Sequence, residues 1–369
     1  MKVLHFFKTY WPDTFGGVER TIHAIATGTM NYGVESDVLS LSSAPDKNSV
    51  EFDGHMAHKA KLDFEFASTG FSRDVFGRFK ALSAQADLIH YHFPWPLMDI
   101  VQLAFHPSKP TLVTYHSDIV KQKLLLQFYK PVMHRFLSSV DRIVATSPNY
   151  VRTSKDLRLY ENKTSVIPLG LDATDYPQSP PEEKAKWRAL FPAPFFLFVG
   201  VLRYYKGIHI LLDAAAVVDR HIVIVGQGPM ESELKVRAKA LGLTNVHFVG
   251  AVSDSAKTAL LELCTALVFP SHLRSEAFGL SLVEAARAGK PMISCEIGTG
   301  TSFVNVDGET GLVVTPDNPP ALANAIMTLA QDTELAARFG QAAQKRFAAL
   351  FTADRMAQSY ARLYREMQA

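Results

Sequence analysis

The chain has 369 residues and a mass of 40.8 kDa, a length that predicts two or three domains at roughly 150 residues each. Its 38 Lys and Arg residues nearly balance its 36 Asp and Glu residues, so the bulk charge does not favour a nucleic-acid-binding protein. Only Cys264 and Cys295 occur, which excludes a disulfide scaffold and a cysteine-ligated metal cluster. The sequence has no apolar run near the roughly 18 residues of a membrane span, and its start is too short in apolar residues for a signal peptide, so we expect a cytoplasmic protein.

Short apolar runs rich in Val, Ile and Phe alternate with helical stretches through the first half of the chain. Residues 3–7 predict a first strand, and a helix is expected from Gly16-Gly17 to about Asn31. Further strands are expected at residues 36–41, 87–92, 111–116, 142–146 and 165–168. These runs are continuous rather than alternating in polarity, which is typical of parallel strands covered on both faces.

The pattern breaks once and then restarts. Residues 172–186 contain prolines and several charges with little apolar content, which predicts a linker or a surface excursion. A second series of strands is expected at residues 195–199, 221–225, 246–249, 266–269 and 291–294. Two such series predict an α/β protein with two doubly wound Rossmann-like domains facing across a cleft. The expected division is an N-terminal domain at 1–170, a linker at 171–192, a C-terminal domain at 193–350, and a C-terminal helix at 351–369 that crosses back to the first domain.

The segment 275–291 follows one of these strands and carries two glutamates, Glu276 and Glu284. We predict a helix from about residue 278 to residue 289, whose first N–H groups lack intrahelical partners and whose positive dipole end suits a diphosphate. Glu276 precedes this helix start, and Glu284 lies about two turns further on. Residues eight apart do not share a helix face, so the two carboxylates are expected to have different roles. The plainer interpretation is a surface helix with an acid in its first turn and a solvated Glu284.

Three other loops at predicted strand ends carry residues suited to a ligand. Arg203 and Lys206 suit phosphate, the first as a planar fork and the second as a point charge. Gly16 and Gly17 would let the backbone approach a ligand closely before a helix begins. His116 would offer a polar contact to a substrate. Each loop also has an ordinary structural explanation: solvated cations, a helix start that requires glycine, and a structural histidine.

Several motifs are absent or incomplete. Residues 226–231 begin like a dinucleotide-binding fingerprint but place Glu231 where the last glycine belongs, which disfavours an NAD-dependent dehydrogenase. The sequence has no two aspartates separated by one residue, so the usual Asp-x-Asp ligand pair for a divalent cation is missing. Other acids remain an alternative for binding a metal, but we predict no metal residue. A two-lobed solute-binding protein would carry an export signal and would not need Glu276 and Glu284.

Taken together and in this order, the motifs resemble the retaining glycosyltransferases of family 4, which have the GT-B fold. The most specific match is Glu276 with Glu284, the family's Glu-x7-Glu motif, followed by residues 289–291 and 308–311. The segments 202–207 and 296–301 look most like bacterial mannosyl- and rhamnosyltransferases of O-antigen and exopolysaccharide assembly. The resemblance implies a metal-independent hexosyltransferase without a cofactor. It also implies that the N-terminal domain binds the acceptor and the C-terminal domain binds the nucleotide-sugar donor.

The resemblance also implies roles for individual residues. Glu284 would hydrogen-bond the donor ribose, and Glu276 and His116 would contact the donor sugar as the catalytic residues. Backbone groups of three residues would meet the phosphates and the sugar: Phe278, Gly279 and Leu280. The other donor-binding residues are two cations at the diphosphate, two glycines of the first domain and one residue against the base: Arg203, Lys206, Gly16, Gly17 and Val252. Many relatives have arginine where this chain has Val201, so either Arg203 takes over that role or Lys206 acts with the helix terminus alone.

The expected reaction transfers α-mannose from GDP-mannose, with retention, to a lipid-linked saccharide in surface polysaccharide or lipopolysaccharide synthesis. A front-face displacement is expected, because no second carboxylate remains to serve as a nucleophile. The alternatives are a GDP-rhamnose- or UDP-sugar-dependent transferase and, more remotely, a non-catalytic two-lobed protein that binds sugar nucleotides. Residues 121–135 mix cations with aromatic and leucine side chains, which predicts either peripheral association with the inner face of the cell membrane or a partly buried helix.

Overall fold

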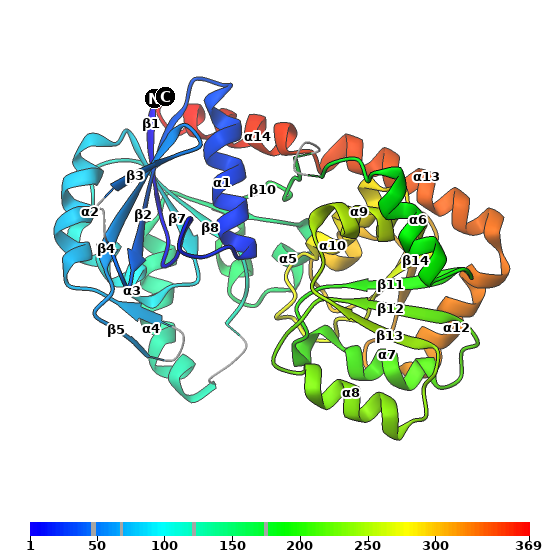
Figure 1. Ribbon diagram of the computed structural model, residues 1–369. Helices are drawn as coiled ribbons and strands as arrows, with labels where there is room; N and C mark the ends of the chain where they lie inside the picture. Colours follow the sequence, from blue (N-terminus) through cyan, green and yellow to red (C-terminus); the bar gives the residue numbers. More distant parts are fainter. Residues whose placement is uncertain (46–48, 67–68, 120–122, 173–175) are drawn as a thin grey trace. The chain divides into compact units, whose positions relative to one another are not determined.

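The computed structural model describes residues 1–45, 49–66, 69–119, 123–172 and 176–369. The chain forms two compact units: unit 1 comprises Met1–Gly170 and Ala353–Ala369, and unit 2 comprises Leu171–Thr352. Each unit is built on its own central sheet flanked by helices (Figure 1). The end of the chain therefore belongs to the same unit as its beginning.

Unit 1 contains an eight-stranded sheet in the order β10-β9-β8-β7-β1-β2-β4-β3. The strands are β1 (Lys2–Phe6), β2 (Glu35–Ser42), β3 (Ser49–Phe52), β4 (His55–Lys61), β7 (Leu88–Phe93), β8 (Thr111–Tyr115), β9 (Arg142–Ala145) and β10 (Thr164–Val166). Neighbouring strands run parallel except β3, which is antiparallel to β4 at the edge. The direction of winding reverses between β1 and β7, which is the switch point of a doubly wound sheet.

Helices and a small hairpin complete unit 1. The helices are α1 (Gly17–Met30), α2 (Asp74–Gln85), α3 (Pro96–Phe105), α4 (Lys123–Ser139), α5 (Pro148–Thr153), a 3₁₀ helix (Leu157–Lys163) and α14 (Ala353–Glu366), and the hairpin is β5 (Phe64–Phe66) with β6 (Thr69–Phe71). Helix α14 packs against α1, side by side in Figure 1. Two tyrosines of α14 reach the sheet, where the Tyr364 hydroxyl lies 2.7 Å from His90 Nδ1 and the Tyr360 hydroxyl lies 2.9 Å from Thr114 Oγ1.

Unit 2 contains a six-stranded, all-parallel sheet in the order β13-β12-β11-β14-β15-β16. The strands are β11 (Phe195–Val199), β12 (His221–Val225), β13 (Val246–Gly250), β14 (Ala266–Phe269), β15 (Met292–Cys295) and β16 (Gly311–Val314). The winding reverses between β11 and β14, so the loops that follow these two strands border the switch point. In an open parallel sheet, this is the place where ligands bind.

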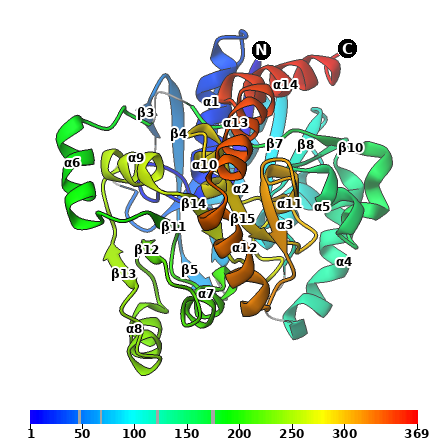
Figure 2. The same ribbon diagram turned by 90° about the vertical axis from the view of Figure 1, so that its right-hand side faces the viewer.

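The helices of unit 2 lie on both sides of this sheet. They are α6 (Pro181–Leu190), α7 (Ile208–Ala215), α8 (Glu231–Ala240), α9 (Asp254–Leu263), α10 (Leu280–Arg287), α11 (Thr301–Val304), α12 (Pro319–Gln331) and α13 (Thr333–Leu350). The apolar sides of α7 and α12 meet the sheet in one buried cluster with residues such as Phe196, Val268 and Ile293. Figure 2 shows α6 beside α9, against which it packs.

The expected linker at 171–192 differs from the structure over residues 181–190, which form helix α6. Two of the prolines that indicated a linker, Pro180 and Pro181, stand at the start of this helix, where the missing N–H of Pro181 and its fixed φ are compatible with the first turn. Trp187 is buried and donates its indole N–H to Glu183 Oε1 at 2.9 Å, which ties the helix to itself as it packs on α9. Residues 173–175 of the expected linker lie outside the described residues.

Most of the predicted strands are confirmed because their apolar runs are buried on both faces. All residues of β7 and β11 are buried, for example, and each bound differs from the prediction by one residue or less. The analysis missed β3, β4, β5, β6 and β16. Strand β4 has the polar sequence His-Met-Ala-His-Lys-Ala-Lys, whose side chains alternate in part between buried and half-buried, so it lacks the continuous apolar signal.

Candidate functional site

Two loops border the switch point of unit 2. The first follows β11 and contains Arg203 and Lys206, and the second follows β14 and contains Glu276 before helix α10 begins. A hydrogen bond from Ser281 Oγ to the carbonyl oxygen of Val199, at 2.9 Å, ties the first turn of α10 to the end of β11. The sheet topology therefore brings residues that are seventy positions apart to one edge.

Lys206 and Glu276 form an ion pair between these loops. The Lys206 Nζ lies 2.5 Å from Glu276 Oε2, and the two side chains are only 11% and 12% exposed. The ammonium also lies 4.7 Å from the centroid of the Phe269 ring at the end of β14. A charged pair that is mostly shielded from solvent is screened less by salt than a surface pair. Lys206 and Glu276, which the sequence analysis singled out separately, are thus bonded to each other.

The loop that carries Lys206 fits against β14 because Gly207 has no side chain. Gly207 has φ +70°, and a Cβ there would lie 2.0 Å from the carbonyl oxygen of Pro270. Glycines of the incomplete fingerprint serve a similar purpose, since a Cβ on Gly226 would lie 2.0 Å from the carbonyl oxygen of Gly200. Gly226 and Gly228 therefore let the β11 loop pass close by, which explains them without a dinucleotide.

Helix α10 begins two residues later than predicted, at Leu280. Gly279, with φ +90°, is its N-cap residue and makes no side-chain capping bond, because glycine has no side chain. Phe278 is buried and lies against Gly300, whose backbone N–H donates to the carbonyl oxygen of Ala277 at 2.8 Å. The N-terminal end of α10, with its positive dipole, therefore begins beside the loop that holds Glu276.

Glu284 has partners of its own, separate from those of Glu276. Its Oε1 atom accepts a hydrogen bond from the Tyr176 hydroxyl at 2.8 Å and pairs with Lys257 Nζ at 3.0 Å. The Arg287 guanidinium lies 4.6 Å from the centroid of the Tyr176 ring. A carboxylate has lone pairs on both oxygens, so Oε2 stays able to accept from a ligand hydroxyl. The two glutamates therefore lie in separate environments, and their predicted difference in role stays a prediction.

Tyr176 and Lys257 were missed by the sequence analysis. Tyr176 lies in the segment expected as a linker, and Lys257 lies in the first turn of α9, where it also pairs with Asp254 at 3.0 Å. An (i, i+3) pair with Asp254 is the only sequence signal that Lys257 carries, and it indicates an ordinary helix surface. Nothing in the local sequence indicates that either residue meets Glu284.

Arg203 and Val252 lie at the edges of this arrangement. Arg203 is exposed, and within the described parts of the chain its guanidinium makes no hydrogen bond or ion pair. Val252 is half-buried in the loop between β13 and α9. The structure therefore brings Lys206, Glu276 and the start of α10 together, whereas Arg203 makes no hydrogen bond or ion pair with them among the described residues.

The glycines predicted in unit 1 lie at the start of α1. Gly16 is the N-cap residue and Gly17 is the first residue of the helix. A Cβ on Gly16 would lie 2.3 Å from Glu19 Oε2, and Glu19 is held in place by the hydroxyls of Thr9 and Thr14 at 2.8 and 3.1 Å. Gly16 thus leaves room for a buried carboxylate at the helix start.

His116 lies directly after β8 and is 8% exposed. Its Nε2 atom lies 3.0 Å from Nδ1 of His92, a residue of the neighbouring strand β7. Burial lowers the pKa of His116 to about 3, so the imidazole is neutral at physiological pH. Unit 1 therefore presents an uncharged polar ring at a strand end, in contrast to the ion pair of unit 2.

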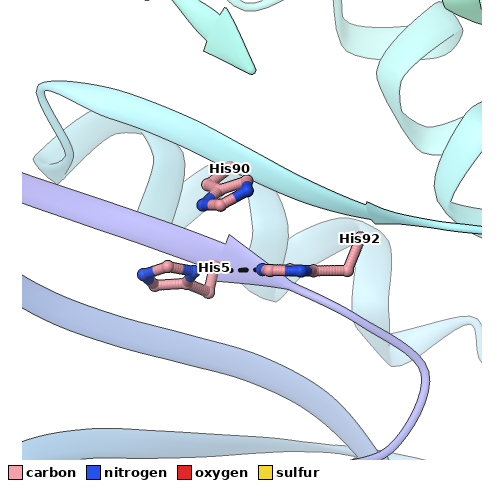
Figure 3. A group of neighbouring side chains, drawn as sticks. All are labelled: His5, His90 and His92. Carbon is pink, nitrogen blue, oxygen red and sulfur yellow. Dashed lines mark hydrogen bonds between the residues drawn. The ribbon is translucent and has the colours of Figure 1, made fainter. Parts of the chain in front are cut away.

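His5, His90 and His92 of unit 1 have the spacing of metal ligands, with one nitrogen of each within 4.8 Å of the others. The rings of His90 and His92 face each other, however, with centroids 4.2 Å apart and planes 30° apart (Figure 3). A metal lies in the plane of each ring that ligates it, so two facing rings do not aim at one ion. Both nitrogens of His90 already hydrogen-bond, to the Tyr364 hydroxyl and to Thr114 Oγ1, each at 2.7 Å. His90 is therefore held by Tyr364 and Thr114, while His5 and His92 hydrogen-bond each other at 3.1 Å.

His209, His272 and Asp317 of unit 2 form a second group with this spacing. His272 Nδ1 lies 2.9 Å from Asp317 Oδ1 without the geometry of a hydrogen bond, and both ring nitrogens of His272 are buried without a hydrogen-bond partner among the described residues. The Tyr204 ring stacks on His209 with centroids 5.0 Å apart. Imidazole and carboxylate donors suit a transition metal such as Zn²⁺, and among the described residues of unit 2 these three have the spacing to hold one.

Comparison with solved structures identifies the fold. Sucrose-phosphate synthase from Thermosynechococcus elongatus has a TM-score of 0.81 to this chain at 23% identity, over 99% of this chain and 98% of that one. Anabaena HepE in complex with UDP has a TM-score of 0.80 at 21% identity, over 99% and 100% of the two chains. The protein thus has the GT-B fold of two Rossmann-like units, as predicted.

Sequence comparisons then identify the family. The Glycosyltransferase Family 4 model matches residues 15–175, and the Glycosyl transferases group 1 model matches residues 181–346. The chain is 54% identical to D-rhamnosyltransferase WbpZ of Pseudomonas aeruginosa, over 96% of this chain and 93% of that protein. It is 48% identical to O-antigen chain mannosyltransferase C of Escherichia coli, over 99% and 98%. The chain belongs to glycosyltransferase family 4, which confirms the predicted family.

Two further points concern the predicted membrane segment. Within the described residues, helices long and apolar enough to cross a bilayer are absent. Lys121 lies outside the described residues, and α4 begins at Lys123. Further along α4, Phe128 is 81% exposed and Lys130 is exposed, whereas Phe136 is buried. Residues two apart do not share a helix face, so Phe128 and Lys130 are exposed on different sides of α4.

Proposed function

We propose that this glycosyltransferase transfers D-mannose, or its 6-deoxy counterpart D-rhamnose, from a GDP-linked donor to a growing O-antigen saccharide. The names of the two similar relatives support this substrate class, since one is a D-rhamnosyltransferase and the other an O-antigen chain mannosyltransferase. The two sugars differ at a single hydroxyl, so one site can be built on the same contacts for both. GDP-mannose is the donor that we favour.

The observation that carries the proposal is the Lys206–Glu276 pair beside the start of α10. When the anomeric C–O bond of the donor breaks, positive charge grows on the sugar ring and negative charge grows on the departing diphosphate. The Lys206 ammonium and the N-terminal N–H groups of α10 stabilise that negative charge where it develops. Arg203, on the same loop, adds a second cation. These groups supply the stabilisation from the protein itself, and we propose a metal-independent reaction.

The same pair favours retention by front-face displacement. Glu276 is engaged by the Lys206 ammonium at 2.5 Å, which stabilises its negative charge and makes the carboxylate a poorer nucleophile toward the anomeric carbon. Glu284 is engaged by Tyr176 and Lys257 and is assigned to the donor ribose. A leaving phosphate oxygen then accepts the proton of the attacking acceptor hydroxyl on the same face of the sugar.

The acceptor is proposed to be lipid-linked, with the protein held peripherally at the membrane. The exposed side chains of Phe128 and Lys130 on α4 support this placement. Flotation with anionic liposomes tests it: Phe128→Ala combined with Lys130→Ala should leave more protein in the unbound fraction. Equal flotation of the variant and the parent would remove the membrane part of the proposal.

The main test supplies the purified protein with GDP-mannose, GDP-D-rhamnose and UDP-glucose, together with a lipid-linked saccharide acceptor. We expect transfer from one or both GDP-sugars, an α-linked product by NMR, and undiminished transfer in the presence of EDTA. A preference for UDP-glucose would overturn the donor. A β-linked product, or a covalent glycosyl adduct on Glu276, would overturn the retaining front-face mechanism.

A further inference from the structure

Three histidine rings of unit 1 form a continuous hydrogen-bonded chain that ends at His116. His5 on β1 has its Nδ1 atom 3.1 Å from Nε2 of His92 on β7, and His92 Nδ1 lies 3.0 Å from His116 Nε2. Figure 3 shows His5 and His92 meeting edge to edge, joined by a dashed line. At the inner end, His5 Nε2 lies 3.5 Å from Ser36 Oγ on β2. The chain thus crosses three neighbouring strands and ends at a strand terminus.

The three rings are neutral, because burial lowers the pKa of His5 and His116 to about 3 and that of His92 well below its usual value. A neutral imidazole carries one N–H and one bare nitrogen. Each contact between two rings needs one N–H, so the tautomer of one ring dictates that of the next. A contact with two N–H groups or with none would be repulsive.

Only two arrangements satisfy both contacts. In the outward state, His5 and His92 each donate from Nδ1 to the next ring, and His116 is left with an N–H at Nδ1. In the inward state, His116 and His92 each donate from Nε2, and His116 Nδ1 is a bare acceptor. The Ser36 hydroxyl can donate to His5 Nε2 in the outward state or accept from it in the inward state. Whether Nδ1 of His116 donates or accepts a hydrogen bond is therefore set by the contact between Ser36 and His5, two rings away.

We propose that His92 and His5 are positioning residues, which hold the His116 ring and set whether its outer nitrogen donates or accepts a hydrogen bond. The inference rests on the proposed function in one respect, because it combines the proposed sugar transfer with the role that the family resemblance implies for His116, a contact with a hydroxyl of the donor sugar. A neutral ring with a fixed plane and a defined polarity orients such a hydroxyl without adding charge near the reacting carbon. His90 lies beside this chain but outside it, since its nitrogens bond Thr114 and Tyr364.

The first test observes the tautomers directly by ¹⁵N NMR of protein labelled at histidine. We expect His5, His92 and His116 to share one tautomer. Ser36→Ala removes the partner of His5 Nε2, and a buried N–H without a partner costs more than a bare ring nitrogen, so all three rings should move to the outward state. The control Thr114→Val should change His90 and leave His116 as it was. Independent tautomers, or Zn²⁺ bound by His5 and His92, would overturn the proposal.

The second test measures the effect on transfer. His92→Leu leaves His116 Nε2 unpaired, and we expect kcat to fall about 10- to 100-fold while the affinity for GDP alone is unchanged. His90→Leu removes an equally buried ring outside the chain, and it should stay within about threefold of the parent. His92→Gln can accept from His5 and donate to His116, so it should recover most of the loss and also serves if the leucine variant does not fold.

The outcomes separate the two proposals. If the parent protein transfers no sugar from any nucleotide, the proposed function fails, and the NMR experiment still decides whether the rings are coupled. If His92→Leu and His92→Gln lose activity equally, or if His90→Leu loses as much as His92→Leu, then His92 acts through packing alone and the positioning role is wrong.

Discussion

At their strand ends, the two units carry opposite chemistry on closely related sheets. Unit 2 places a lysine–glutamate ion pair beside a helix N-terminus, whereas unit 1 places a chain of neutral histidines that ends at His116. Both sheets are doubly wound, so topology alone does not account for the contrast. Fixed charge suits the anionic diphosphate of a donor, and neutral rings suit the hydroxyls of a sugar. The comparison shows that two sheets of the same winding can present different side-chain chemistry at their strand ends.

The largest expected effect is a loss of stability of unit 1 in acid. The pKa values of His5, His90, His92 and His116 lie below the usual 6.5 because these rings are buried. Below about pH 6.5, these histidines become protonated in the unfolded chain but stay neutral in the folded chain. Stability is therefore complete above that pH and falls as the pH drops toward the folded values, by up to about 1.4 kcal/mol per pH unit for each histidine that stays neutral.

Hydrogen exchange followed by mass spectrometry tests this difference between the units. Peptides from β1 and β7 should lose protection between pH 7 and pH 5 sooner than peptides from β11 and β14. Equal protection of β7 at both pH values would contradict the argument that the buried histidines dominate the acid response.

The next largest effect concerns the ion pair between Lys206 and Glu276 in unit 2. Lys206→Met removes the ammonium that we propose to stabilise the developing diphosphate charge, and we expect kcat/KM to fall about 100- to 1000-fold. Lys235→Met is the matched control, because Lys235 forms an ion pair of 2.7 Å with Glu231 on the exposed surface of α8. This substitution should leave kcat/KM nearly unchanged. Steady-state kinetics with the preferred donor provides the measurement. A Lys206→Met enzyme of normal speed would remove the basis of the proposed mechanism.

A smaller effect is expected from the glycine that lets the two loops of unit 2 meet. Gly207→Ala would place a Cβ 2.0 Å from the Pro270 carbonyl oxygen at φ +70°. Gly242→Ala has a similar φ, +65°, but nothing within 4 Å of its Cβ. We expect the control to lose about 1 kcal/mol of stability and Gly207→Ala to lose about 2 kcal/mol or more. Urea unfolding monitored in unit 2 measures both, and equal losses would show that the close approach does not matter.

The smallest effect concerns the surroundings of Glu284. Lys257→Met removes the cation that lies 3.0 Å from Glu284 Oε1, and the donor KM should rise about tenfold with little change in kcat. Lys184→Met breaks an ion pair with Glu262 elsewhere in unit 2 and is the control. If Lys257→Met lowered kcat and left KM unchanged, Glu284 would not act in ground-state binding of the donor.

The sequence by itself determined the architecture and the family of this protein. Continuous apolar runs are enough to predict strands that are buried on both faces, because parallel sheets covered by helices leave no polar face. Two local features are visible in the sequence alone: the spacing of Glu276 and Glu284, and the position of Lys206 after a strand. Polar strand β4 was missed because its sequence lacks a continuous apolar run. The helix that begins at Pro181 was predicted as part of a linker because its prolines and charges are typical of loops, although packing stabilises a helix there.

Only the tertiary structure decided which side chains meet. Lys206 reaches Glu276 across seventy residues because β11 and β14 are neighbours in the sheet, and Tyr176 and Lys257 reach Glu284 from segments with no motif of their own. His5 and His92 join His116 only because β1, β7 and β8 lie side by side. Hydrogen bonds and ion pairs act over about 3 Å, and strand order, which brings distant residues within that range, is a property of the folded sheet.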